Sequence, residues 1–185
     1  MDRAGRAGIV ARLKANADVF RALLVDVTDE QARWKPEPGK WSLLEVASHL
    51  ADEERDDFRR RLDLTLHHPG TPWPPIDPEG WSVERRYNER ELGRVLEDLL
   101  SERRESIRGL QELVGSEGPG KSGAPVEPDW DAAYDHPKLG PVTAGDLLTS
   151  WLAHDFIHIR QMTRLHREYL VAVLSAHSPD YAGKW

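Results

Sequence analysis

Four long segments of the chain repeat apolar residues at helical spacing, and no other feature constrains the fold as strongly. The segments cover residues 5–26, 42–66, 89–114 and 143–165. The first of them repeats Ile9, Leu13, Ala17, Phe20 and Leu24, and Val27 directly after it continues the spacing. Such spacing places the apolar side chains on one face of a helix. Four amphipathic helices bury these faces against one another, so we predict an all-α fold, an antiparallel four-helix bundle.

Capping signals mark where two of these helices begin. Residues 42–45 read Ser-Leu-Leu-Glu, and residues 143–146 read Thr-Ala-Gly-Asp. In each, a hydroxyl group can accept a hydrogen bond from the third helical residue, whose carboxylate reaches back to the first N–H group. We therefore expect helices to begin directly after Ser42 and Thr143.

Two segments rich in proline and glycine, residues 69–81 and 115–141, separate the helices. Proline fixes the backbone and lacks an N–H group, so we predict loops there and no strand in the chain. The second segment is long for a connection inside a compact domain, and such loops commonly serve a function. Residues from about 178 onwards should form an irregular tail of a single domain spanning residues 1–185.

The composition excludes several functions. A formal charge of −7 argues against nucleic acid or an anionic membrane as a partner. The chain has no cysteine, which excludes disulfides and a thiol nucleophile of its own. No apolar run approaches the roughly 20 residues that span a bilayer, and the first residues lack the apolar core of a signal peptide. We expect a cytoplasmic protein with a small-molecule partner.

Two runs of mixed charge, residues 53–57 and 102–105, read Glu-Glu-Arg-Asp-Asp and Glu-Arg-Arg-Glu. Mixed signs are typical of a solvated helix face, so we expect both runs to face water. Glu54 is an exception, because helical spacing also places it within the apolar stripe of the second helix.

His154 and His158 carry the strongest functional signal. They are four residues apart in the fourth helix, so both lie on one face, one turn apart. Trp151 and Met162 share that face, which should enter the core. Burying an unpaired imidazole costs about 1–3 kcal/mol, and a divalent transition metal would remove the cost because neutral imidazole is a good ligand. The alternative is that carboxylates, or water at a bundle end, satisfy both histidines.

A third ligand has to come from another helix, and His49 in the second helix is the best candidate. By helical angle His49 lies at the flank of its apolar stripe, so it could equally be an ordinary, partly exposed histidine. Three histidines would leave one position of a tetrahedral metal open to water or substrate. Such a site makes an enzyme plausible, although metal binding alone does not establish catalysis.

Other side chains could support the site. Glu53, one turn from His49, and Glu54 could orient a ligand or act as a general base, and both could equally be solvated acids. Gln161, one turn beyond His158, could hold that imidazole or form hydrogen bonds at the surface.

A substrate pocket can also be predicted. Trp151 and Met162 flank the two histidines of the fourth helix and would form its apolar walls, with residues 115–141 closing over it. Asp155 lies off the ligand face and is expected to be solvated or ion-paired.

Three segments together resemble the DinB-like superfamily of helical bundles. Residues 41–52 read Trp-Ser-Leu-Leu-Glu-Val-Ala-Ser-His-Leu-Ala-Asp, residues 136–143 read His-Pro-Lys-Leu-Gly-Pro-Val-Thr, and residues 154–161 read His-Asp-Phe-Ile-His-Ile-Arg-Gln. Their order, spacing and position in the expected helices agree with that family over residues 5–170.

The resemblance implies a bundle that binds zinc or nickel through His49, His154 and His158. It also implies relatives that use low-molecular-weight thiols such as mycothiol or bacillithiol. One hypothesis is a metal-dependent enzyme that transfers such a thiol to an electrophile or hydrolyses a small molecule. The alternative is a non-catalytic metal-binding or ligand-sensing bundle, and a homodimer is compatible with this family.

Overall fold

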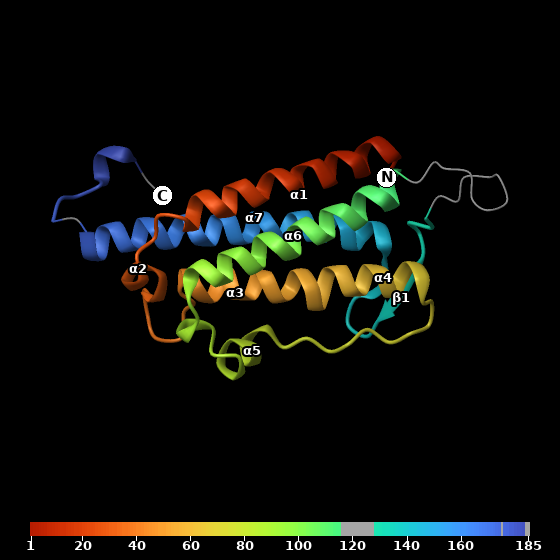
Figure 1. Ribbon diagram of the computed structural model, residues 1–185, viewed down its shortest axis with the longest axis horizontal. Coiled ribbons are helices and arrows are strands. Elements are labelled where there is room, and N and C mark those ends of the chain that lie inside the picture. The colour runs from red at the N-terminus through yellow and green to blue at the C-terminus, as the bar shows by residue number, and fades with distance from the viewer. Residues whose placement is uncertain (116–127, 175, 184–185) are drawn as a thin grey trace.

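The protein forms the expected four-helix bundle in a computed structural model, which describes residues 1–115, 128–174 and 176–183 (Figure 1). The long helices are α1 (Arg3–Leu24), α3 continued by α4 (Leu43–Asp52 and Arg60–His67), α6 (Leu92–Gly115) and α7 (Ala144–Tyr169). The π-helical segment η1 (Glu53–Arg59) joins α3 to α4 without a break. Short helical elements are α2 (Asp29–Arg33), α5 (Pro78–Glu84), η2 (Tyr87–Glu89), η3 (Leu170–Leu174) and η4 (Asp180–Ala182).

The long crossover between α4 and α6 sets the topology. Figure 1 shows that residues 68–91 run back along the whole bundle before α6 begins, so α3 and α6 point the same way while α1 and α7 point the other way. Helix α6 packs against both α1 and α3, and α7 packs against α1 and the α3–α4 helix. The α3–α4 helix and α7, which carry the histidines, are therefore antiparallel neighbours.

Both predicted capping boxes are present. Ser42 Oγ accepts a hydrogen bond from the Glu45 N–H, and Glu45 Oε2 accepts one from the Ser42 N–H. Thr143 and Asp146 make the same reciprocal pair at the start of α7. Because each pair satisfies two backbone N–H groups that the helix leaves free, the starts of α3 and α7 could be predicted locally.

The prediction of a chain without strands was wrong. Strands β1 (Ala133–His136) and β2 (Gly140–Thr143) pair antiparallel at the end of the segment expected to be a loop, and β2 extends two residues beyond it. Tyr134 of β1 stacks on Trp73 of the crossover, with ring centroids 4.3 Å apart, so a distant part of the chain supports this hairpin. The closing function predicted for residues 115–141 falls partly on residues 116–127, which lie outside the described residues.

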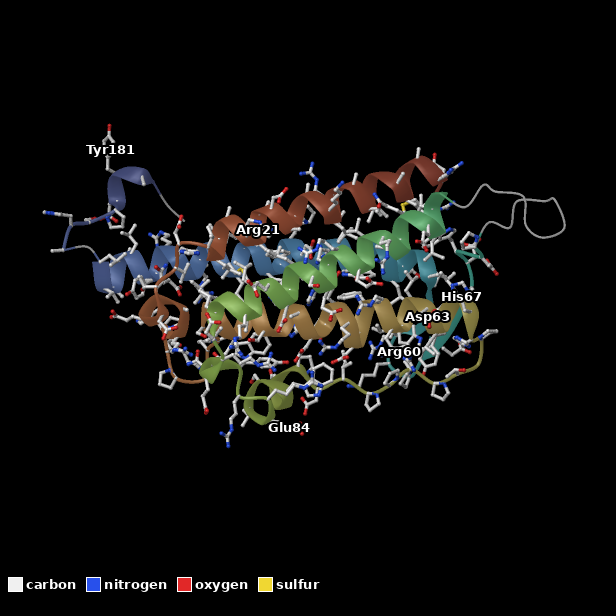
Figure 2. All side chains as sticks on the ribbon, in the orientation of Figure 1. Arg21, Arg60, Asp63, His67, Glu84 and Tyr181 are labelled. Atoms are coloured by element: carbon white, nitrogen blue, oxygen red, sulfur yellow. The ribbon has the colours of Figure 1, made fainter. Side chains whose placement is uncertain are left out.

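The core consists of two apolar clusters separated by a polar layer. Phe20, Leu44, Leu99 and Met162 belong to one cluster, and Leu13, Phe58, Leu110, Leu148 and Trp151 belong to the other. Each long helix contributes a buried polar residue between its two apolar stretches, namely Asn16, Glu54, Arg103 and Asp155. Exposed charged side chains such as Arg21, Arg60 and Glu84 lie on the outside of the bundle (Figure 2).

None of the helices in the described part of the chain is both long and apolar enough to cross a membrane.

Candidate metal centre

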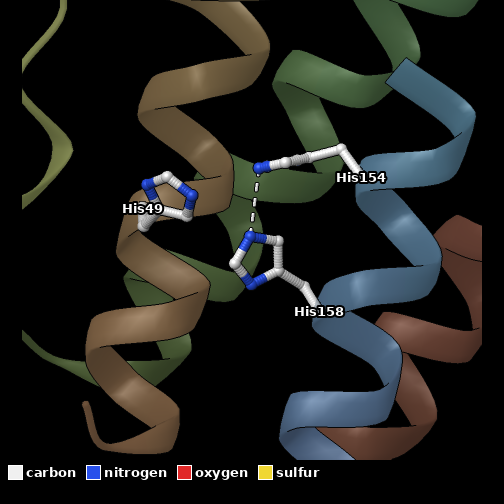
Figure 3. A group of neighbouring side chains, drawn as sticks. All are labelled: His49, His154 and His158. Carbon is white, nitrogen blue, oxygen red and sulfur yellow. Dashed lines mark hydrogen bonds between the residues drawn. The ribbon is translucent and has the colours of Figure 1, made fainter. Parts of the chain in front are cut away.

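Three histidine side chains from two helices converge beside the polar layer (Figure 3). His49 comes from α3, and His154 and His158 come from successive turns of α7. One nitrogen of each ring lies within 4.8 Å of the others, and the Nε2 atoms of His154 and His158 are 3.0 Å apart. The structure thus brings together all three residues that the sequence predicts as metal ligands.

Burial keeps these imidazoles neutral. It lowers the pKa of His49 to about 2 and that of His154 to about 3, and the proximity of His158 contributes to both shifts. The pKa of His158 is lowered as well, again mainly by burial. At neutral pH each ring therefore keeps a nitrogen lone pair available for a ligand.

The donor set fits a single divalent transition metal. Three neutral imidazoles are typical ligands of zinc and of related metals. In a tetrahedral zinc site the ligand nitrogens lie about 3.3 Å apart. The nitrogens of these three histidines lie within 4.8 Å of one another, so small ring rotations would bring them to that spacing. The buried Nδ1 of His49 has no hydrogen-bond partner within the described chain and lies 3.9 Å from Glu53 Oε1.

Gln161 orients the ring of His158. Its Oε1 lies 2.8 Å from His158 Nδ1, so the amide oxygen can accept a hydrogen bond from the Nδ1–H group. This contact favours the tautomer that leaves Nε2 unprotonated, on the side facing His154. Gln161, which the sequence placed one turn beyond His158, therefore contacts that side chain directly.

Two aromatic rings enclose the cluster. Trp41 lies 4.9 Å from the ring of His49, and Phe58 lies 5.2 Å from the ring of His154, measured between centroids. Phe58 also stacks on Trp151, with ring centroids 5.4 Å apart. These rings limit the access of water to the histidines, which is consistent with their low pKa values.

Glu53 lies beside His49 and shares its environment with a second acid. Its Oε1 is 3.9 Å from His49 Nδ1, and its side chain hydrogen-bonds to Asp57. Burial and the adjacent Asp57 raise the pKa of Glu53 to about 8, while Arg61 forms an ion pair with Asp57 at 2.7 Å. Glu53 can therefore hold a proton near neutral pH, next to a candidate ligand.

Glu54 lies in a different environment from Glu53. Its Oε1 is 2.8 Å from Arg103 Nε, and its Oε2 accepts a hydrogen bond from Trp151 Nε1 at 3.0 Å. Arg103 also binds Asp155 through two contacts of 2.7 Å. Both oxygens of Glu54 are engaged in this buried network, which favours a structural contribution.

The expectation that residues 53–57 and 102–105 face water was wrong at three positions, because Glu53, Asp57 and Arg103 are buried. Glu54, which helical spacing had placed in the apolar stripe, is buried as well. The π-helical segment η1 explains part of this difference, because its wider turn lets neighbouring residues both point inwards. Glu53 lies towards His49 and Glu54 towards Arg103.

The predicted pocket walls are more deeply buried than expected. Met162 is fully buried in the apolar core, so its side chain offers no surface to a substrate in this structure. Trp151 is 1 % exposed and lines a cavity of about 360 Å³ between α4 and α6. Asp155 was expected to be solvated or ion-paired, and the structure shows it fully buried and ion-paired with Arg103.

Arg103 and Asp57 are site residues that the sequence interpretation missed. Arg103 falls four residues after Leu99 and four before Ile107, on the apolar stripe of the third helix. A charge at such a position requires a buried partner, and this signal was available. Asp57 follows Glu53 by four residues, a spacing that allows contact on a helix.

The fold and the site together define the class of this protein. It is a helical bundle in which three neutral histidines from two antiparallel helices form a candidate metal centre. The chain belongs to the DinB superfamily, whose family model matches residues 12–162. A similar solved structure is that of YfiT from Bacillus subtilis, described as a probable metal-dependent hydrolase with an unusual four-helix bundle topology. The two structures agree with a TM-score of 0.74 and 19% sequence identity, covering 90% of this chain and 89% of that chain. No curated protein matches the sequence.

Proposed function

We propose that this protein is a metal-dependent hydrolase of a small molecule, with His49, His154 and His158 as ligands of one zinc or nickel ion. The convergence of three neutral imidazoles on one point, two of them buried and that of His154 half-buried, is the observation that carries the proposal. The description of the similar protein YfiT as a probable metal-dependent hydrolase supports the same class of reaction. Three protein ligands leave a position for water or substrate.

Each residue around the site would have a separate role in the reaction. A bound divalent metal polarises a substrate carbonyl and lowers the pKa of water. Glu53, whose raised pKa lies near neutral, would exchange a proton with the reacting groups. Gln161 would hold His158 in the ligating tautomer, and Trp41 and Phe58 pack against the rings of His49 and His154. We assign Glu54 to the stability of the bundle, because its oxygens are occupied by Arg103 and Trp151.

Thiol transfer is the second candidate. The same open position would accept the thiolate of a small molecule, and the chain has no cysteine to compete for the metal. A non-catalytic metal-binding bundle would differ from both enzymes by holding a fourth protein ligand. Among the described residues, the three histidines form the only group of histidine and acidic side chains suited to hold an ion.

The test is hydrolysis of a panel of small esters and amides by zinc- and nickel-loaded protein. We expect a turnover that chelator treatment removes, that metal restores, and that His154→Ala abolishes. Metal-loaded protein that turns over neither this panel nor a thiol with an electrophile would contradict an enzymatic function.

A further inference from the structure

A second cavity lies next to the histidine cluster, and its chemistry differs from that of the cluster. It measures about 400 Å³ and lies between the segment preceding α3 and the C-terminal half of α7. It is lined by Pro36, Lys40, Trp41, Ile157, Arg160, Gln161, Arg164 and Leu165. The start of α3 and the later turns of α7 lie at the same end of the bundle (Figure 1).

Two of the lining residues connect this cavity to the candidate metal ligands. The ring of Trp41 lies 4.9 Å from that of His49, and Gln161 contacts His158 Nδ1 at 2.8 Å. A molecule in the cavity would therefore lie against the same two side chains that orient and shield the ligands. This proximity makes the cavity a natural place for the part of a substrate that does not react.

The charge of the cavity is strongly one-sided. It contains three cations, Lys40, Arg160 and Arg164, and no acidic residue, although the whole chain carries a formal charge of −7. Arg164 is partly neutralised by Glu168 at 2.7 Å. Lys40 and Arg160 form no ion pair with the described residues, so their charges remain available. Cations concentrated beside an apolar wall attract anions and raise their local concentration.

We propose that this cavity binds the anionic group of the substrate, and that the substrate class is small carboxylates or phosphates whose reactive group reaches the metal. Trp41 and Leu165 provide an apolar surface for the part that links the two groups. Arg160 provides the directional contact, because a guanidinium can bind a carboxylate or phosphate through two parallel hydrogen bonds. The proposal rests on the proposed metal centre. It adds a preference for anionic over neutral substrates, which three neutral histidines cannot provide.

The test uses the full chain loaded with Co(II) and a matched pair of probes. The probes are ω-mercaptocarboxylates with three to six carbons and the corresponding neutral mercaptoamides, and the readout is the absorbance of the cobalt–thiolate bond. Wild-type protein should bind the best carboxylate about tenfold more tightly than its amide, the effect expected from two exposed cations together. The double variant Lys40→Gln/Arg160→Gln should lose this preference and bind the amide as before.

A matched control removes the same charge elsewhere. Arg12→Gln/Arg104→Gln alters exposed arginines of α1 and α6, away from the cavity, and should keep the preference. Equal binding of carboxylates and amides by wild type, or a preference that survives in Lys40→Gln/Arg160→Gln, would overturn the inference. If either of these results came with normal binding of the amides, the metal centre would still be supported and only this inference would fall. Failure to bind cobalt would overturn the proposed function as well.

Discussion

Arg103 and Asp155 form a bidentate ion pair at the centre of the bundle, with both nitrogen–oxygen distances at 2.7 Å. Asp155 directly follows His154 in α7, and it also accepts a hydrogen bond from Asn16 of α1. The pair therefore holds α7 at a fixed rotation, with Asp155 facing α6 and α1 while His154 and His158 face α3. Stability and the histidine geometry depend on the same buried contact.

Arg103→Leu should destabilise the protein by about 3–5 kcal/mol, because it leaves two buried carboxylates, Asp155 and Glu54, without their cation. Urea denaturation followed by circular dichroism measures the effect. Arg104→Leu, at an exposed neighbouring position, is the control and should change the free energy of unfolding by less than about 0.5 kcal/mol. Equal stability of the two variants would show that the polar layer contributes little.

Untagged protein should bind about one equivalent of divalent metal, as expected for one site, and lose it when His49, His154 or His158 is replaced by alanine. Elemental analysis by mass spectrometry gives the stoichiometry directly. His68→Ala removes an exposed histidine and should leave the metal content unchanged. A double variant His154→Ala/His158→Ala that still holds a full equivalent would refute the assignment.

Gln161→Leu should weaken metal binding about tenfold or more, since the variant can no longer accept a hydrogen bond from His158 Nδ1–H. Gln161→Glu keeps an acceptor at the same position and should retain the affinity. Competition with a chromophoric chelator measures both. If the leucine variant binds metal as tightly as wild type, the ring of His158 is held by other contacts.

Glu53→Gln should change how stability depends on pH. In the folded protein the pKa of Glu53 is raised to about 8, against 4.5 for the ordinary group. Between these values the unfolded chain has released a proton that the folded protein keeps, so this residue lowers stability as pH rises, by up to about 1.4 kcal/mol per pH unit. Glutamine does not titrate, so the variant should gain stability relative to wild type from about pH 5 to pH 8.

Urea denaturation of metal-free protein across that range checks this expectation. Glu84→Gln, which alters an exposed acid of α5, serves as the control and should follow the wild-type pH dependence. Parallel curves for Glu53→Gln and wild type would mean that Glu53 is already ionised in the folded protein.

Local interactions explain what could be predicted about the fold. The four long helices and the capping boxes at Ser42 and Thr143 depend on residues three or four positions apart, and these distances are visible in a sequence. His154 and His158 belong to the same category, because their spacing within one helix already places them on one face. The family resemblance added His49, for which helical angle alone left two alternatives open.

The sequence by itself therefore determined the four amphipathic helices, their capped starts, and the pairing of two histidines on the core face of the last helix. Only the tertiary structure decided that Glu54 meets Arg103, that Arg103 meets Asp155, and that β1 and β2 form a hairpin against Trp73. The physical reason is that the stability of a buried charge depends on its partners. Arg103 and Asp155 are 52 residues apart in the chain, and nothing in the local pattern of either helix specifies the other.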